Sequence, residues 1–151
     1  MRFKKLTKNL IINIDSIICF KRNTDGSIFL YTSGQYDENK HTNTHHIDKE
    51  ENVDWNEFMK LIISENENDW IKTKTFSSLF THHTDANLLI NKKYIDYVYK
   101  SKNPFNEDQP LTVFKLTIIC SGFATEIPFE NISVTEDGGL IYNEEKSLEE
   151  E

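Results

Sequence analysis

The sequence has few of the residues that crosslink or interrupt a chain, with two cysteines, three prolines and five glycines among 151 residues. Both cysteines, Cys19 and Cys120, lie inside apolar stretches, which favours buried free thiols over a disulfide or a redox pair. The glycines are scattered as turn residues, so the sequence has no glycine-rich phosphate-binding loop. A Gly-x-Ser-x-Gly nucleophile elbow is also absent.

Long hydrophobic runs are missing as well. No apolar stretch approaches the roughly 20 residues that cross a bilayer. Residues 1–20 begin basic and then turn apolar, as a secretory signal does. Asn13 and Asp15 interrupt the apolar part, however, and Ile18 is too bulky for a small-residue cleavage site. We therefore expect a cytoplasmic protein without a membrane partner.

Positive charge is in the minority, since 17 Lys and Arg residues face 25 Asp and Glu residues and the formal net charge is -8. An acidic surface repels a nucleic-acid backbone, which disfavours nucleic acid as the partner. The 10 Phe, 6 Tyr and 2 Trp residues are more aromatic content than disordered chains carry. We expect one compact domain over residues 1–143, followed by a disordered acidic tail over 144–151.

Two β-branched runs, at residues 10–20 and 28–32, are joined through Asp25-Gly26, which favours a tight hairpin turn. Asn13, Asp15 and Ser16 predict a bend within the first run. Residues 35–52 are almost without apolar side chains and predict an irregular segment. Farther along, residues 70–80 and 123–132 predict strands, and Asp137-Gly138-Gly139 predicts a turn into a strand at 140–142.

One amphipathic helix is predicted over residues 54–64. Asp54 is a suitable N-cap, and Glu57 stands three residues later as in a capping box. The apolar side chains recur at helical spacing and form one stripe, which is more often core than ligand pocket. They are Trp55, Phe58, Met59 and Ile62.

A second β unit aligns with the first. The segment at 88–100, LLINKKYIDYVYK, matches the segment at 10–22, LIINIDSIICFKR, at an offset of 78. Leu, Ile, Asn and Ile are shared, at positions 10/88, 12/90, 13/91 and 17/95. The triplets TSG at 32–34 and CSG at 120–122 align at an offset of 88, which places a ten-residue insertion in the loop at 101–110.

Two interpretations of this likeness stay open: a tandem duplication with units 3–64 and 81–135, or a chance match between β-rich segments. In either case the predicted fold is α+β and mostly β. It consists of antiparallel hairpins with one amphipathic helix between the two units.

Two family resemblances follow from these residues. Residues 6–34 and 54–63, with the pattern LTKN-LIINIDSIICF, DGSIFLYTSG and then the helix, resemble FlbD-type small flagellar β proteins. The histidine-rich segment interrupts this likeness, and Lys92-Lys93 replace Ile14-Asp15 in the second unit. Residues 80–95, FTHHTDANLLINKKYI, are similar to a strand of LytTR-type DNA-binding domains. His83 and Thr84 stand where that family has Arg and Ser.

The histidines and carboxylates do not form a recognisable catalytic or metal-binding motif. His41 and His45 with Asp48 or Glu50 would suit a metal only on a helix, which this segment does not predict. His82 and His83 are adjacent and would point to opposite faces of a strand. Glu126 and Glu130, four apart on an extended segment, are separated by about 13 Å, which is long for a glycosidase pair. We expect no enzyme, cofactor or metal.

The leading hypothesis is a non-enzymatic protein–protein interaction module, for example an inhibitor or immunity-type protein, or a phage-encoded accessory or assembly protein. Its exposed sheet edges or acidic surface would bind a protein partner, such as a basic one, or a second copy in a homo-oligomer.

Two alternatives come from other classes. In the first, the protein is a nucleic-acid-binding β domain that uses an N-terminal basic arm and a Lys/Tyr strand. Its residues would be Arg2, Lys4, Lys5, Lys8, Lys92, Lys93, Tyr94 and Tyr97. In the second, a β-sheet pocket sequesters a small ligand or a metal through the histidines.

Overall fold

The structure is a computed structural model, and it describes residues 2–35, 42–74, 87–103, 108, 110–116, 122–125 and 127–142. The predicted fold class is confirmed, because the described chain consists mostly of antiparallel sheets with one α-helix between two groups of strands. The described part contains no helix that is long and apolar enough to span a bilayer.

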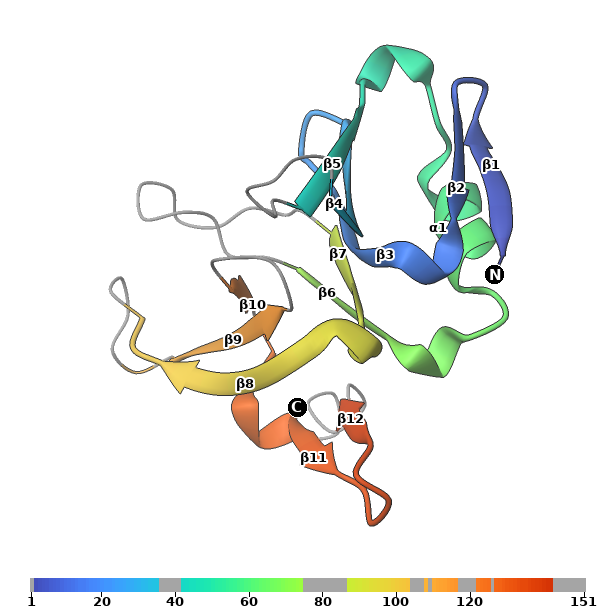
Figure 1. Ribbon diagram of the computed structural model, residues 1–151. Coiled ribbons are helices and arrows are strands. Elements are labelled where there is room, and N and C mark those ends of the chain that lie inside the picture. The colour runs from blue at the N-terminus through green and yellow to red at the C-terminus, as the bar shows by residue number, and fades with distance from the viewer. Residues whose placement is uncertain are drawn as a thin grey trace.

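A five-stranded antiparallel sheet lies at the centre of the molecule, with the strand order β5-β4-β3-β7-β6 (Figure 1). Its strands are β3 (Ile17–Arg22), β4 (Ile28–Gln35), β5 (Thr42–Ile47), β6 (Trp70–Lys74) and β7 (Asn87–Asn91). The predicted hairpin is β3–β4. Gly26 takes a φ of 93° in its turn, and the Asp25 carboxylate accepts the Ser27 N–H at 2.9 Å.

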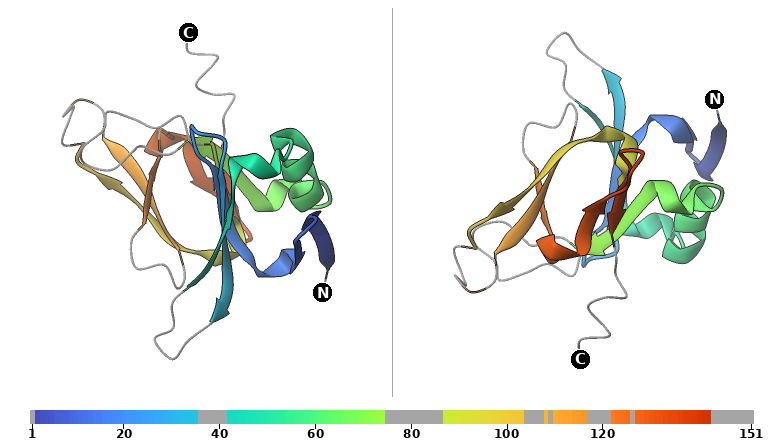
Figure 2. Two further views of the ribbon diagram at one scale, coloured as in Figure 1. Left: turned by 90° about the horizontal axis from the view of Figure 1, so that it is seen from above. Right: turned by 90° about the horizontal axis from the view of Figure 1, so that it is seen from below.

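Separate layers cover the two faces of this sheet (Figure 2). The hairpin of β1 (Phe3–Thr7) and β2 (Leu10–Asn13) covers one face together with α1 (Trp55–Ile63). The other face is covered by the β8–β9–β10 sheet and the β11–β12 hairpin. Their bounds are β8 (Ile95–Ser101), β9 (Leu111–Leu116), β10 (Phe123–Thr125), β11 (Ile132–Val134) and β12 (Leu140–Tyr142).

Two hydrophobic cores result, one on each side of the central sheet. Successive side chains of a strand point to opposite faces, so Phe20 lies in the core under α1 while Cys19 lies in the core under β9. Both side chains are fully buried. Phe114 of β9 is also fully buried and belongs to the second core.

The helix α1 forms as predicted. The Asp54 carboxylate accepts the Glu57 N–H at 3.1 Å, which satisfies one of the unpaired donors of the first turn. Phe58 and Ile62 of the predicted stripe are buried, and Trp55 and Met59 pack against the edge of the same core.

Short 3₁₀ turns connect several strands, and three of them end in the same way. They are η1 (Ile14–Ser16), η4 (Lys92–Tyr94) and η5 (Phe129–Asn131). Each is followed by an isoleucine that starts the next strand and whose N–H bonds back to the first carbonyl of the turn: Ile17, Ile95 and Ile132. Two other turns, η2 (Lys49–Glu51) and η3 (Glu67–Asp69), flank α1.

The strand arrangement is repeated along the chain. A hairpin, β1–β2, leads through η1 into the meander β3–β4–β5, and a second hairpin, β6–β7, leads through η4 into the meander β8–β9–β10. Asn13 and Asn91 cap the two turns with nearly equal φ values of −77° and −78°. The register shift after Ile17 in β3 recurs after Ile95 in β8.

This register corrects the predicted alignment of the returning strands. Ile17 pairs with Thr32 and Ile95 pairs with Leu116, so the returning strands match at an offset of 84, not 88. Leu30 and Phe114, both buried, occupy equivalent positions. Packing sets the register here: Thr32 of the TSG triplet is buried and pairs with Ile17, whereas Cys120 and Ser121 of the CSG triplet lie outside the described residues.

The bounds of the repeated arrangement also differ from the predicted units 3–64 and 81–135. The arrangement spans residues 3–47 and 70–125, because β6 corresponds to β1. Whether it arose by duplication stays a prediction, as does the single-domain assignment for residues 1–143.

The prediction of an irregular segment over 35–52 is wrong for residues 42–47, which form β5. This strand pairs with β4 alone among the described strands, and of its residues 44–47 only Ile47, opposite Ile28, is buried. An edge strand needs few apolar residues, which explains why its sequence is so polar. The predictions for Cys120, His41, His82, His83, Glu126 and the tail at 144–151 concern residues outside the described ranges.

Candidate interaction groove

A groove of about 970 Å³ runs beside β8 and is lined by residues of that strand and of the β11–β12 hairpin. Four consecutive residues of β8, Ile95 to Val98, line it, which places the groove along the edge of the strand. β8 pairs with β9 on its other side and with no further described strand. Residues of β11 and β12 and of the turns η4 and η5 complete the lining, among them Lys92, Phe129, Ile132, Val134 and Leu140.

Large apolar side chains in this groove are exposed to solvent. Tyr97 is 56% exposed, Val134 is 74% exposed and Phe129 is 37% exposed. Such side chains, gathered beside a strand edge that pairs with no other described strand, are typical of an interaction surface. Sequence reasoning identified Tyr97 but missed Phe129 and Val134. The only signal in the sequence for these two residues was that Val134 is apolar while its neighbours in a short strand are polar.

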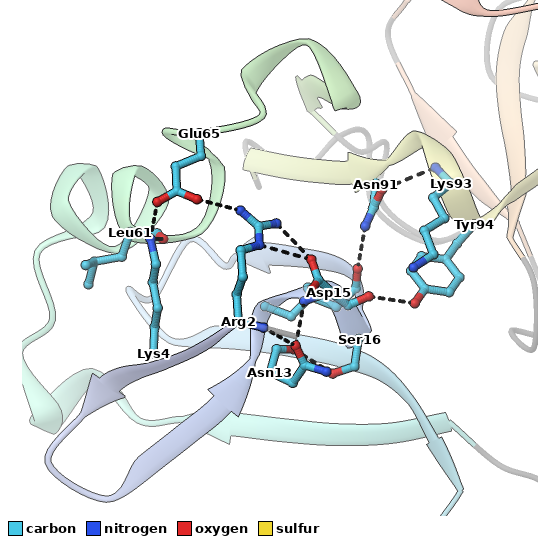
Figure 3. Close-up of polar contacts among 11 residues, drawn as sticks. Arg2, Lys4, Asn13, Asp15, Ser16, Leu61, Glu65, Asn91, Lys93 and Tyr94 are labelled. Carbon is cyan, nitrogen blue, oxygen red and sulfur yellow. Dashed lines mark hydrogen bonds and ion pairs between the residues drawn. The ribbon is translucent and has the colours of Figure 1, made fainter.

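At one end the groove meets a polar network centred on Asp15 (Figure 3). The Arg2 guanidinium donates to the Asp15 carboxylate at 2.8 Å and to the Glu65 carboxylate at 2.9 Å. The Tyr94 hydroxyl donates to the Asp15 carbonyl at 2.8 Å, which connects η4 to η1. Arg2 is therefore held by two carboxylates of its own chain.

The Arg2 hydrogen bonds hold the pKa of Asp15 below its ordinary value, with a smaller contribution from the nearby positive charges. Asp15 therefore stabilises the fold above its unfolded-state pKa of about 3.9, and this stabilisation is lost as the pH falls through the lower folded-state pKa. We expect Arg2→Gln to raise the pKa of Asp15 in an NMR titration of the carboxyl carbon. An unchanged Asp15 pKa in this variant would show that the ion pair does not set it.

Asn91 connects the second part of the repeated strand arrangement to the first. Its side-chain NH₂ donates to the Ile17 carbonyl at 3.0 Å, and its side-chain oxygen accepts the Lys93 N–H at 3.2 Å. The residue is buried. One side chain therefore caps η4 and also attaches the end of β7 to the start of β3 (Figure 3).

The structure brings together only some of the residues predicted for nucleic-acid binding. Arg2, Lys92, Lys93 and Tyr97 line the groove. Three carboxylates also line it, those of Asp15, Asp69 and Asp96, and they equal its cationic side chains in number. The groove therefore has no excess positive charge to attract phosphates.

The remaining predicted residues lie elsewhere. Lys4 donates to the Leu61 carbonyl at 2.7 Å at the end of α1. Lys5 is exposed on the β1–β2 hairpin, and Lys8 lines a smaller hollow beside Glu50 and Glu51. Tyr94 points into the network around Asp15, with the Lys93 ammonium 5.2 Å from its ring centre.

Histidine and cysteine contribute no site of their own in the described residues. His46 stacks on Phe29 with ring centres 4.8 Å apart, and its Nδ1 lies 3.6 Å from an Asp48 carboxylate oxygen. No group of three metal-ligating side chains occurs in this part of the chain. Burial raises the pKa of the Cys19 thiol far above its ordinary value, which leaves it unreactive.

Comparisons of the chain with protein-family models, curated proteins and solved structures find no match. The resemblances to FlbD-type proteins and to LytTR-type domains therefore rest only on the residues quoted for them.

Proposed function

We propose that this protein is a non-enzymatic protein–protein interaction module that binds its partner through the groove beside β8. The observation that carries this proposal is the combination of a β8 edge without a described strand neighbour and the exposed side chains of Tyr97, Phe129 and Val134. A strand edge offers backbone hydrogen bonds to an added strand, and the adjacent apolar side chains supply burial and specificity.

The charges of the groove fit this mode of binding. With three cationic and three carboxylate side chains in its lining, the groove neither attracts nor repels strongly by net charge. Binding energy would come from apolar burial and backbone pairing. The overall charge of -8 would instead increase the rate of association with a basic partner, in a salt-dependent way. Inhibitors, immunity-type proteins and phage accessory or assembly proteins belong to this functional class.

A matched pair of variants tests this proposal. Val134 pairs with Leu140, and both line the groove, whereas Ile141 pairs with Ser133 and points to the opposite face of the same hairpin. We expect Val134→Asp to lose a partner that affinity purification from the native host recovers with the wild-type protein. Ile141→Asp, 46% exposed in the wild type, should retain that partner. Equal recovery with both variants would place the binding surface elsewhere.

Nucleic-acid binding remains the second candidate, because Lys92, Lys93 and Tyr97 line one groove and the Tyr97 and Tyr99 rings lie 5.9 Å apart. Exposed aromatic rings between lysines can stack on unpaired bases. With carboxylates equal in number to the cations, we expect no gel shift of a single-stranded oligonucleotide at low salt. A shift that disappears in the Lys92→Glu/Lys93→Glu variant would favour this second candidate over the first.

A further inference from the structure

The repeated strand arrangement shows which kind of strand pairs with an edge equivalent to that of β8. β8 corresponds to β3, which begins at the equivalent isoleucine and has the same register shift. β3 pairs with β4 on one side and with β7 on the other, in an antiparallel register that places Phe20 opposite Leu89. The groove beside β8 lies where a β7-like strand would pair.

The chain also contains a β7-like strand without a second neighbour among the described residues. β2 corresponds to β7 and pairs with β1 alone, as β7 pairs with β6. In this correspondence Phe3 matches Trp70 and Ile11 matches Leu89. Trp70 and Leu89 are 7% and 2% exposed and lie in the same core as Phe20. Their counterparts Phe3 and Ile11, in contrast, are 62% and 65% exposed.

We infer that a second copy of this chain binds the groove by pairing its β2 antiparallel to β8, as β7 pairs with β3. This inference rests on the proposed function of the groove and identifies its partner. The β3–β7 register predicts that Tyr97 lies opposite Ile12, Val98 opposite Ile11 and Tyr99 opposite Leu10 of the second copy. One pairing would bury the exposed residues of the hairpin and those of the groove at the same time.

Charge is compatible with this contact. Residues 1–14 carry four basic side chains and no acidic one, while the whole chain has a net charge of -8. The basic hairpin of one copy is attracted by the net negative charge of the other copy, which speeds their approach, while the groove itself has equal numbers of cationic and carboxylate side chains and does not oppose the contact. The pairing joins the β2 edge of one copy to the β8 edge of the other, two different strands, so the contact is heterologous and joins copies head to tail.

A mixing experiment with the full chain tests this inference. Ile11→Asp removes the hairpin surface and Val134→Asp removes the groove surface, while Ile11→Val and Ile141→Asp serve as matched controls. By analytical ultracentrifugation, we expect the wild type and both controls to exceed the 17.8 kDa of one chain as concentration rises. Each Asp variant alone should self-associate on the order of a hundredfold more weakly, because a carboxylate would be buried without a partner.

The decisive result comes from mixing the two Asp variants, since each retains the surface that the other has lost. We expect the mixture to form one-to-one dimers that grow no further. In a Cys120→Ser background, mixed Ile11→Cys and Val98→Cys chains should crosslink, because directly paired residues bring their Cα atoms within disulfide range. Circular dichroism of each variant separates loss of folding from loss of assembly.

Three outcomes would overturn this inference: a wild type that stays monomeric, a mixture of Asp variants that stays monomeric, or assembly that neither substitution affects. A monomeric wild type that still recovers a groove-dependent host partner would overturn self-association and leave the proposed function standing. Recovery of no groove-dependent partner of any kind would overturn both.

Discussion

Replacing Phe20 by alanine is expected to lower the free energy of unfolding by about 3–5 kcal/mol and the melting temperature on the order of 10 °C. Phe20 is fully buried in the core under α1. Its ring centre lies 5.6 Å from Trp55, 5.7 Å from Phe58 and 5.6 Å from Trp70. Truncation would therefore leave a cavity between the central sheet and the helix that covers it.

The matched control is Phe20→Leu, which fills most of the same volume and should cost clearly less. Urea denaturation followed by tryptophan fluorescence measures both variants, because Trp55 and Trp70 flank the site. A Phe20→Ala variant that loses less than about 1 kcal/mol would show that this ring is not the centre of the core.

The second large effect is expected for Asn91→Ala, which should cost about 3 kcal/mol. The substitution removes the cap of η4 and leaves the Ile17 carbonyl without the donor that connects β7 to β3. A buried acceptor that loses its donor is more costly than a missing surface hydrogen bond.

Asn13→Ala is the internal control for this prediction, since Asn13 holds the equivalent position in the first hairpin. Its side-chain oxygen accepts the Asp15 N–H at 3.1 Å and the Arg2 N–H at 3.2 Å, at a half-buried site. We expect a cost of about 1.5 kcal/mol, from the lost cap and one further bond. Thermal or urea unfolding of both variants under the same conditions gives the comparison. Equal costs would mean that the contact between Asn91 and Ile17 adds nothing to the cap.

Local features of the fold were predictable from the sequence because they depend on neighbouring residues. Asp25-Gly26 predicts the hairpin turn through its tolerance of positive φ, and Asp54 predicts the start of α1 through its capping carboxylate. Asn13 and Ser16 predict a bend, and the structure shows a 3₁₀ turn there. The equivalence of Asn13 and Asn91 was likewise visible, and both cap a turn.

The candidate site was predictable only in part. Lys92, Lys93 and Tyr97 were selected for their charge and aromatic character, and they line the groove. Phe129 and Val134 were not selected, because the sequence does not show whether a single apolar residue in a short segment is buried; in the structure they are 37% and 74% exposed. Two of the three carboxylates that balance the cationic side chains, Asp15 and Asp69, come from segments distant from the lysines, and composition alone does not reveal such proximity.

The sequence by itself determined the β3–β4 hairpin, the turn at η1 and the helix α1, since capping and glycine placement act over a few residues, but it did not predict the polar edge strand β5. Only the tertiary structure decided that β7 pairs with β3 while β8 and β2 each keep one side without a described strand neighbour. The reason is that backbone hydrogen-bonding groups are nearly the same at every edge, so sequence does not specify which edges meet. Packing of the two cores makes that choice, and the groove beside β8 results from it.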